Sequence, residues 1–280
     1  MGASIGRIRP VRLASFLFIL IPAILISVFP LIVMISTSFK TSQEVYIPPP
    51  TFLPRAPTIQ NYFDIWTVAP LRIYFRNSLY IGLGSTAMAL LLGIPAGYAL
   101  ARFRFQGRRF FLLFLLVIQM FPPVVIILGL FRLVVALNMM DNLLTLIVLN
   151  GIFSLSFITW LLMGYFMTVP PEIEEAAMMD GNSRVGAMIR MTLPLSWPGL
   201  MAVSIFGFMA GWNEFLFALT FVRSQEKLPL TIGLFKFITR FQVQWHQLMA
   251  AALLATIVVL ILFMMIQNHL TRGMVATGEK

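Results

Sequence analysis

Residues 143–167 read LLTLIVLNGIFSLSFITWLLMGYFM and contain no charged side chain. A helix needs about 20 apolar residues to cross the hydrocarbon core of a bilayer, because each residue adds about 1.5 Å of length. This stretch therefore predicts a transmembrane helix. Outward from it in both directions, five more stretches satisfy the same criterion: 13–37, 77–101, 110–136, 198–222 and 248–270.

The composition agrees with six spans. Hydrophobic residues make up 59% of the 280 residues and charged residues 11%, with a mean hydropathy of +0.91. A soluble domain is about half apolar and about a quarter charged, so this chain has too few charges to cover a water-facing surface. The predicted class is an all-α integral membrane protein with six transmembrane helices.

The basic residues predict the orientation of these helices. Arg102, Arg104, Arg108 and Arg109 fill the short connection between the second and third spans. Short loops rich in Lys and Arg stay in the cytoplasm. Arg7, Arg9 and Arg12 before the first span and Arg272 and Lys280 after the last share that side, so both termini are expected to be cytoplasmic. The net charge of +10 then reflects membrane orientation rather than nucleic-acid binding.

Three regions follow from this arrangement. Residues 1–72 hold the first span and an external loop, residues 73–270 hold the other five spans, and residues 271–280 form a cytoplasmic tail. Residues 38–76 are expected to be an irregular external loop. Residues 223–247, with Phe235, Phe237, Phe241 and Trp245, are expected to be an amphipathic helix at the outer interface.

The cytoplasmic connection 168–197 begins with TVPPEIEEAAMMDGNSRVGAMIRMTLP, residues 168–194. Pro170 and Pro171 suit the first turn of a helix, and Gly181 suits a left-handed helix terminator. Asn182 or Ser183 then caps a second short helix, which Leu193-Pro194 ends. These signals predict a rigid helical knob that docks on a partner, although an ordinary interfacial loop remains the alternative.

The residues expected at this docking surface share a place in the two short helices or the turn between them. They are Glu172, Glu174, Glu175, Ala176, Ala177, Met178, Asp180, Gly181, Arg184, Arg190, Leu193 and Pro194.

The spacing of this segment resembles the EAA signature of ABC-importer permeases. Glu175-Ala176-Ala177 is followed after three residues by Gly181, and after nine more by Met191, one residue and Leu193-Pro194. Together with Trp212-Asn213-Glu214-Phe215, this is similar to sugar-type, binding-protein-dependent permeases of the maltose-transport kind. Asn182 departs from the pattern, since a small residue is common there, and Met191 stands where isoleucine is usual.

The resemblance implies a type I ABC importer permease fold and a set of partners. These are a second homologous permease, two ATP-binding subunits that receive the cytoplasmic loops, and an external solute-binding protein. The implied function is movement of an oligosaccharide or related polyol across the plasma membrane of a bacterium or archaeon by alternating access. The sequence has no Gly-x-x-x-x-Gly-Lys-Ser/Thr loop, so ATP and Mg²⁺ are expected on a partner and no cofactor on this chain.

Polar residues within apolar spans are candidates for a solute path or gate, because they are costly in hydrocarbon. They are Trp212, Asn213, Glu214, Asn150, Ser154 and Gln119, the last just before Pro122-Pro123, where a broken helix is expected. The alternative for Glu214 is structural, with its carboxylate holding the fifth span to a neighbouring helix. Hydrogen bonds between helices are likewise the alternative for Asn150 and Ser154.

Two other function classes are alternatives to an importer subunit. A self-contained secondary transporter predicts inverted repeats and buried coupling acids, whereas no repeat is evident and Glu214 is the one acid within a span. A membrane enzyme or redox subunit predicts clustered acids or paired histidines. With no cysteine, and with His246 and His269 near opposite ends of one span, no metal site is predicted.

Overall fold

The computed structural model describes residues 10–239 and 242–277, in which the helices include five long and apolar enough to span a membrane, or six if one bent pair counts as a span. Arg7, Arg9, Phe241 and Lys280 lie outside the described residues. The chain divides into two compact units. One is drawn from Met1–Val68 and Phe237–Leu254, and the other, called here the core unit, from Ala69–Lys236 and Ala255–Lys280.

The first unit contains α1 (Pro10–Ser38), α2 (Ser42–Tyr46), α3 (Asn61–Val68) and the start of α14 (Trp245–Thr277). The prediction of an irregular loop over 38–76 is wrong, because α2 and α3 lie within it and α4 already begins at Leu71. The side-chain amide of Asn61 donates to the carbonyls of Ser38 and Lys40, both at 2.8 Å. This buried amide holds α3 against the end of α1.

The core of the second unit is formed by α4 (Leu71–Arg102), α7 (Leu143–Thr168) and α11 (Trp197–Trp212). Ala89, Ile158, Leu162 and Val203 are buried where these helices meet. The approach is close, since a Cβ at Gly211 would lie 2.5 Å from Ser85 Oγ. Small residues allow such backbone contact between membrane helices.

The predicted third span is broken. α5 (Arg108–Met120) and α6 (Pro123–Ala136) meet at an angle of 97° around Phe121 and Pro122. Pro122 and Pro123 both lack the N–H that would continue α5. Pro123 instead suits the first turn of a new helix, α6. The span predicted over 110–136 is therefore bent rather than straight, and the break expected next to Gln119 is confirmed.

The predicted fifth span is also interrupted. α11 ends at Trp212 and α12 (Leu216–Phe221) begins after Asn213–Phe215, so the span predicted over 198–222 is present but its helix is interrupted. Residues 223–247 are not one interfacial helix either. They form η2 (Gln225–Lys227), α13 (Leu230–Gly233), η3 (Leu234–Phe237) and an isolated bridge between Ile238 and Val243.

Contacts with α4 explain the irregular path after α12. The Asn77 amide donates to the carbonyls of Glu226 at 2.8 Å and Leu228 at 3.0 Å, and Ser78 Oγ accepts the backbone N–H of Leu230 at 2.9 Å. These tertiary hydrogen bonds satisfy backbone groups that a continuous helix would pair internally.

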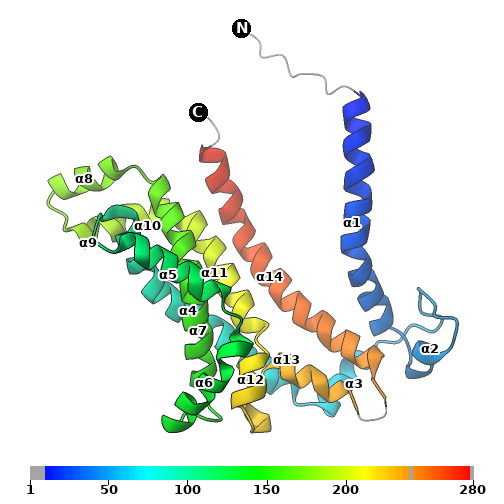
Figure 1. The fold of residues 1–280 in the computed structure, drawn as a ribbon. Helices are drawn as coiled ribbons and strands as arrows, with labels where there is room; N and C mark the ends of the chain where they lie inside the picture. The colour runs from blue at the N-terminus through cyan, green and yellow to red at the C-terminus, as the bar shows by residue number, and fades with distance from the viewer. Residues whose placement is uncertain (1–9, 240–241, 278–280) are drawn as a thin grey trace. The chain divides into compact units, whose positions relative to one another are not determined.

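The connection between α7 and α11 folds into α8 (Pro171–Met179), α9 (Arg184–Ala187), the π-turn η1 (Met188–Thr192) and α10 (Leu193–Leu195). Figure 1 shows α8 and α9 at one end of the core unit and α6 and α12 at the opposite end. The prediction that Leu193-Pro194 ends the second short helix is wrong. In the wider π-turn, the Leu193 N–H reaches back to the carbonyl of Met188, and the helical path continues through Pro194, which has no N–H to pair.

Candidate functional site

A cavity of about 580 Å³ opens in the core unit between the two broken spans and α7. Five of the predicted path residues line it together: Gln119, Asn150, Ser154, Asn213 and Glu214. Aromatic side chains make up much of the remaining wall: Phe121, Phe153, Phe157, Phe206, Phe215 and Phe217. The breaks in α5–α6 and α11–α12 thus turn polar residues distant in sequence toward one space.

Trp212 does not face this cavity. Its indole is 4% exposed and packs with Phe208, with ring centroids 5.5 Å apart, and with Phe75 at 6.1 Å. The prediction that Trp212 lies on the path with Asn213 is therefore wrong, because successive helical residues point about 100° apart. Trp212 belongs to the packing between α4 and α11.

Glu214 closes the break in the fifth span. Its Oε1 accepts the N–H of Phe217 at 2.6 Å, and its Oε2 accepts the N–H of Ala218 at 2.9 Å. Its backbone carbonyl accepts the Thr231 hydroxyl. These bonds satisfy the first N–H groups of α12, which would otherwise be unpaired in an apolar environment. The Glu214 carboxylate thus has a structural role within the fifth span itself, rather than holding that span to a neighbouring helix.

We expect Glu214→Ala to destabilise the protein by about 0.5–2 kcal/mol, the range for loss of a side chain that caps the first N–H groups of a helix. Transport is also expected to change, because Phe215 and Leu216 on the cavity wall follow directly. Glu214→Gln keeps one acceptor oxygen and is expected to lie between the alanine variant and the parent. Thermal unfolding in detergent tests the order, and equal melting temperatures for all three proteins would contradict the capping role.

The α8–α9 hairpin, residues Pro171–Ala187, turns at Gly181 as predicted. Gly181 has a φ of +89°, its N–H donates to the carbonyl of Met178, and the N–H of Asn182 donates to that of Ala177, both at 3.1 Å. This pair of backbone hydrogen bonds is a Schellman motif. Ser183 caps α9 by accepting the N–H of Gly186 at 3.1 Å, which decides between the two predicted caps.

The predicted docking residues divide into an exposed set and a buried set. Glu172, Glu175, Ala176, Asp180, Gly181, Arg184 and Arg190 are exposed, as are Pro194 and the neighbouring Met179, which is 89% exposed at the tip. Met178 and Leu193 are half-buried, whereas Ala177 and Glu174 are buried. The exposed set forms the outward surface of the hairpin.

Asn182 has a structural reason for departing from the family pattern. Its side chain donates to the carbonyl of Ala177 at 3.1 Å and accepts a hydrogen bond from Arg190 Nη1 at 2.8 Å. The guanidinium of Arg184 lies over the ring of Phe103, 5.1 Å from its centroid. Both arginines therefore brace the hairpin, as well as being exposed at its surface.

Glu174 points into the protein rather than toward the docking surface. Its carboxylate accepts hydrogen bonds from the Tyr98 hydroxyl at 2.6 Å, Arg102 Nε at 2.7 Å and the Thr192 hydroxyl at 2.6 Å. Burial raises the pKa of Glu174, but the bonds from Thr192, Tyr98 and Arg102 outweigh it and hold the pKa below its ordinary value. The carboxylate is therefore ionised at neutral pH.

Sequence reasoning missed the three donors to this carboxylate. Arg102 was interpreted only as an orientation signal, and Tyr98 and Thr192 were not singled out. The one available signal was a tyrosine four residues before an arginine, which places both on one face of a helix. Most of the cavity phenylalanines were also missed, because a phenylalanine in an apolar span does not stand out from its neighbours.

Residues 89–276 match the family of binding-protein-dependent transport system inner membrane components. The chain belongs to this family. It is 36% identical to the inner membrane ABC transporter permease protein YcjP of Escherichia coli (strain K12), over 92% of each chain. It is 33% identical to the diacetylchitobiose uptake system permease protein DasC of Streptomyces coelicolor, over 98% of each chain.

The fold also has a counterpart of known structure. A chain of a bacterial ABC transporter involved in the import of the acidic polysaccharide alginate superposes with a TM-score of 0.78, at 22% identity, over 94% of this chain and 98% of that one. The present chain is thus a permease subunit of a binding-protein-dependent ABC importer and a multi-pass inner membrane protein. It is a transport component rather than an enzyme, working with ATPase and binding-protein partners.

Proposed function

We propose that this permease imports a carbohydrate, an oligosaccharide or related polyol, and that the solute passes through the cavity lined by Asn150, Ser154 and Asn213. The observation that carries this proposal is the composition of the wall, which combines neutral amides and a hydroxyl with phenylalanine rings. Amide and hydroxyl groups bind sugar hydroxyls, and aromatic rings cover the apolar faces of sugar rings. The relative named for diacetylchitobiose uptake supports the same solute class.

The exposed surface of the α8–α9 hairpin is proposed to dock on an ATP-hydrolysing subunit, which holds the ATP and Mg²⁺. A second, homologous permease would present its own hairpin to a second such subunit. Arg102 contacts Glu174, so the arginine-rich connection 102–109 lies at the same end as α8. Because short basic loops are cytoplasmic, this supports a cytoplasmic hairpin, with both termini on that side.

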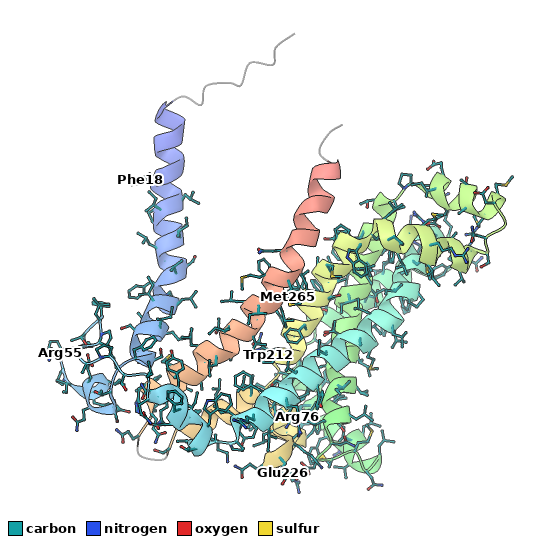
Figure 2. The ribbon with its side chains drawn as sticks, turned by 180° about the vertical axis from the view of Figure 1, so that it is seen from behind. Phe18, Arg55, Arg76, Trp212, Glu226 and Met265 are labelled. Carbon is teal, nitrogen blue, oxygen red and sulfur yellow. The ribbon has the colours of Figure 1, made fainter. Side chains whose placement is uncertain are left out.

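The external binding protein is then proposed to deliver the solute at the opposite end of the core unit. Figure 2 places Arg76 and Glu226 toward that end, away from α8 and α9. The Asp141 carboxylate accepts hydrogen bonds from the backbone N–H groups of Arg223 at 2.9 Å and Ser224 at 2.8 Å. It also forms an ion pair with Lys227 at 3.2 Å. The hydrogen bonds from Ser224 are the main cause of the lowered pKa of Asp141, so the loop after α12 is held rigidly by an ionised group.

A bulky substitution in the cavity tests this function. Ser154→Trp is expected to abolish uptake, because the indole occupies the space that the solute needs. The matched control, Ile152→Trp, introduces the same side chain on α7 at a position that is 48% exposed and does not line the cavity. Its uptake is expected to equal that of the parent.

The measurement is ATP-dependent uptake of labelled neutral di- and trisaccharides into proteoliposomes that contain the complete importer and its binding protein. Unchanged uptake in Ser154→Trp would show that the solute does not use this cavity. A parent importer that transports amino acids but none of these saccharides would overturn the solute class.

A further inference from the structure

The Glu174 carboxylate joins three separate parts of the core unit. It extends from α8, it accepts hydrogen bonds from Tyr98 and Arg102 near the end of α4, and it accepts one from Thr192 at the end of the π-turn η1. The side chains of Arg102 and Glu174 are only 9% and 6% exposed. Hydrogen bonds to ionised partners are short and about twice as strong as neutral ones, so this junction is stiff.

Arg102 adds a second fastening at the start of the hairpin. While Nε bonds to Glu174, Nη2 donates to the carbonyl of Val169 at 2.8 Å, just before α8 begins. One planar guanidinium therefore holds both the end of α7 and the first turn of α8. Moving α8 relative to α4 would leave a buried charge unpaired, which is far more costly than keeping the pair together.

The cavity wall includes α7, whose end is fastened at this junction, and α11. Asn150 and Ser154 are on α7, and Phe206 and Gly207 are on α11. α4 packs directly behind that wall, since a Cβ at Gly207 would lie 3.2 Å from the side chain of Thr86. A displacement of the end of α4 therefore reaches the wall through rigid helices in contact.

The bond to Thr192 gives a second route to α11. The Thr192 carbonyl accepts the N–H of Ser196 at 2.9 Å, and the Ser196 carbonyl accepts that of Leu200 at 2.9 Å within α11. The intervening π-turn is a wider piece of helix, of a kind frequent at functional sites. Glu174 is thus bonded to both elements that connect the hairpin to the cavity.

We propose that Glu174 is the positioning residue that transmits movement of the docked hairpin to the cavity, through α4 on one side and η1–α11 on the other. Its neighbour Glu175 is exposed on the outward surface, so adjacent acids serve separate purposes: Glu175 meets the partner, and Glu174 conveys the movement inward. This inference rests on the proposed docking of the hairpin on the ATPase.

The experiment uses the complete importer in proteoliposomes and two cysteine reporters, since the natural chain has no cysteine. Met179→Cys, at the exposed tip of α8, reports docking by cross-linking to the ATPase subunit. Ser154→Cys, on the cavity wall, reports transmission through its rate of modification by a maleimide, compared between nucleotide-free and vanadate-trapped complexes. Neither readout requires the solute to be known.

In Glu174→Gln, the Met179→Cys cross-link is expected to persist, whereas the nucleotide-dependent change in the Ser154→Cys rate is lost. Glu175→Gln is the matched control, the same change one residue along, and is expected to weaken the cross-link itself. Tyr98→Phe removes one hydroxyl but keeps the ion pair, and is expected to reduce the rate change partly. If Glu174→Gln does not assemble, the rate change in Tyr98→Phe decides whether this junction transmits the movement.

The inference is overturned if Glu174→Gln, per assembled complex, shows the same rate change as the parent. A merely structural role would lower the yield and the melting temperature but leave that change intact. If Met179→Cys in the parent does not cross-link to the ATPase at all, the proposed docking itself fails, so the two failures are distinguishable.

Discussion

Gly181→Asp is expected to abolish uptake and co-purification with the ATPase while the protein still inserts in the membrane. Gly181 has a φ of +89°, and no other atom lies within 4 Å of the position a Cβ would take, so the hairpin has room for a side chain. Asn and Asp both tolerate this left-handed conformation better than other residues with a side chain. The damage is therefore expected from a second negative charge beside Asp180 on the exposed turn.

Gly181→Asn is the control that separates charge from backbone strain, because asparagine has nearly the same shape as aspartate without its charge. It is expected to retain most of the uptake. Gly181→Val, with a branched Cβ that is poorly tolerated at positive φ, is expected to lose uptake through distortion of the turn. If the aspartate and asparagine variants behave alike, the turn does not lie at a charged interface.

Arg102→Ala is expected to cause the largest loss of stability, about 3–5 kcal/mol, as found when one partner of a buried ion pair is removed. The variant leaves the Glu174 carboxylate buried without its cation and the Val169 carbonyl without its donor. Arg102→Lys restores a charge but cannot hold both acceptors with one planar group, so its stability is expected to be intermediate. Thermal unfolding in detergent at pH 7 gives the order.

The dependence on pH has a definite sign. Because the pKa of Glu174 is lowered in the folded protein, the stability it contributes is present above the unfolded pKa, about 4.3 for glutamate, and is lost as the pH falls through the folded value. In Arg102→Ala, burial is opposed by fewer bonds, so the folded pKa is higher and less stability is lost on acidification than in the parent. Identical profiles of melting temperature against pH in the parent and Arg102→Ala would contradict this account.

The membrane spans and the turns of the hairpin are determined by the sequence itself, because both depend on local properties. Twenty or more apolar residues span a bilayer whatever they pack against. The start of α8 at Pro171, its termination at Gly181 and the cap at Ser183 follow from missing donors, positive φ and a side-chain acceptor within three residues. Asn150 and Ser154 were candidates for a solute path for the same reason, since they stand out against apolar neighbours, and both line the cavity.

Only the tertiary structure decided which way neighbouring side chains face. Glu174 and Glu175 are the same residue type at adjacent positions, yet one is buried under Tyr98 and Arg102 and the other is exposed. Trp212 and Asn213 divide in the same way between the packed core and the cavity. The physical reason is that local sequence sets where a helix such as α8 begins and ends. Which face of α8 is covered depends instead on a helix distant in sequence, α4, whose end packs against it.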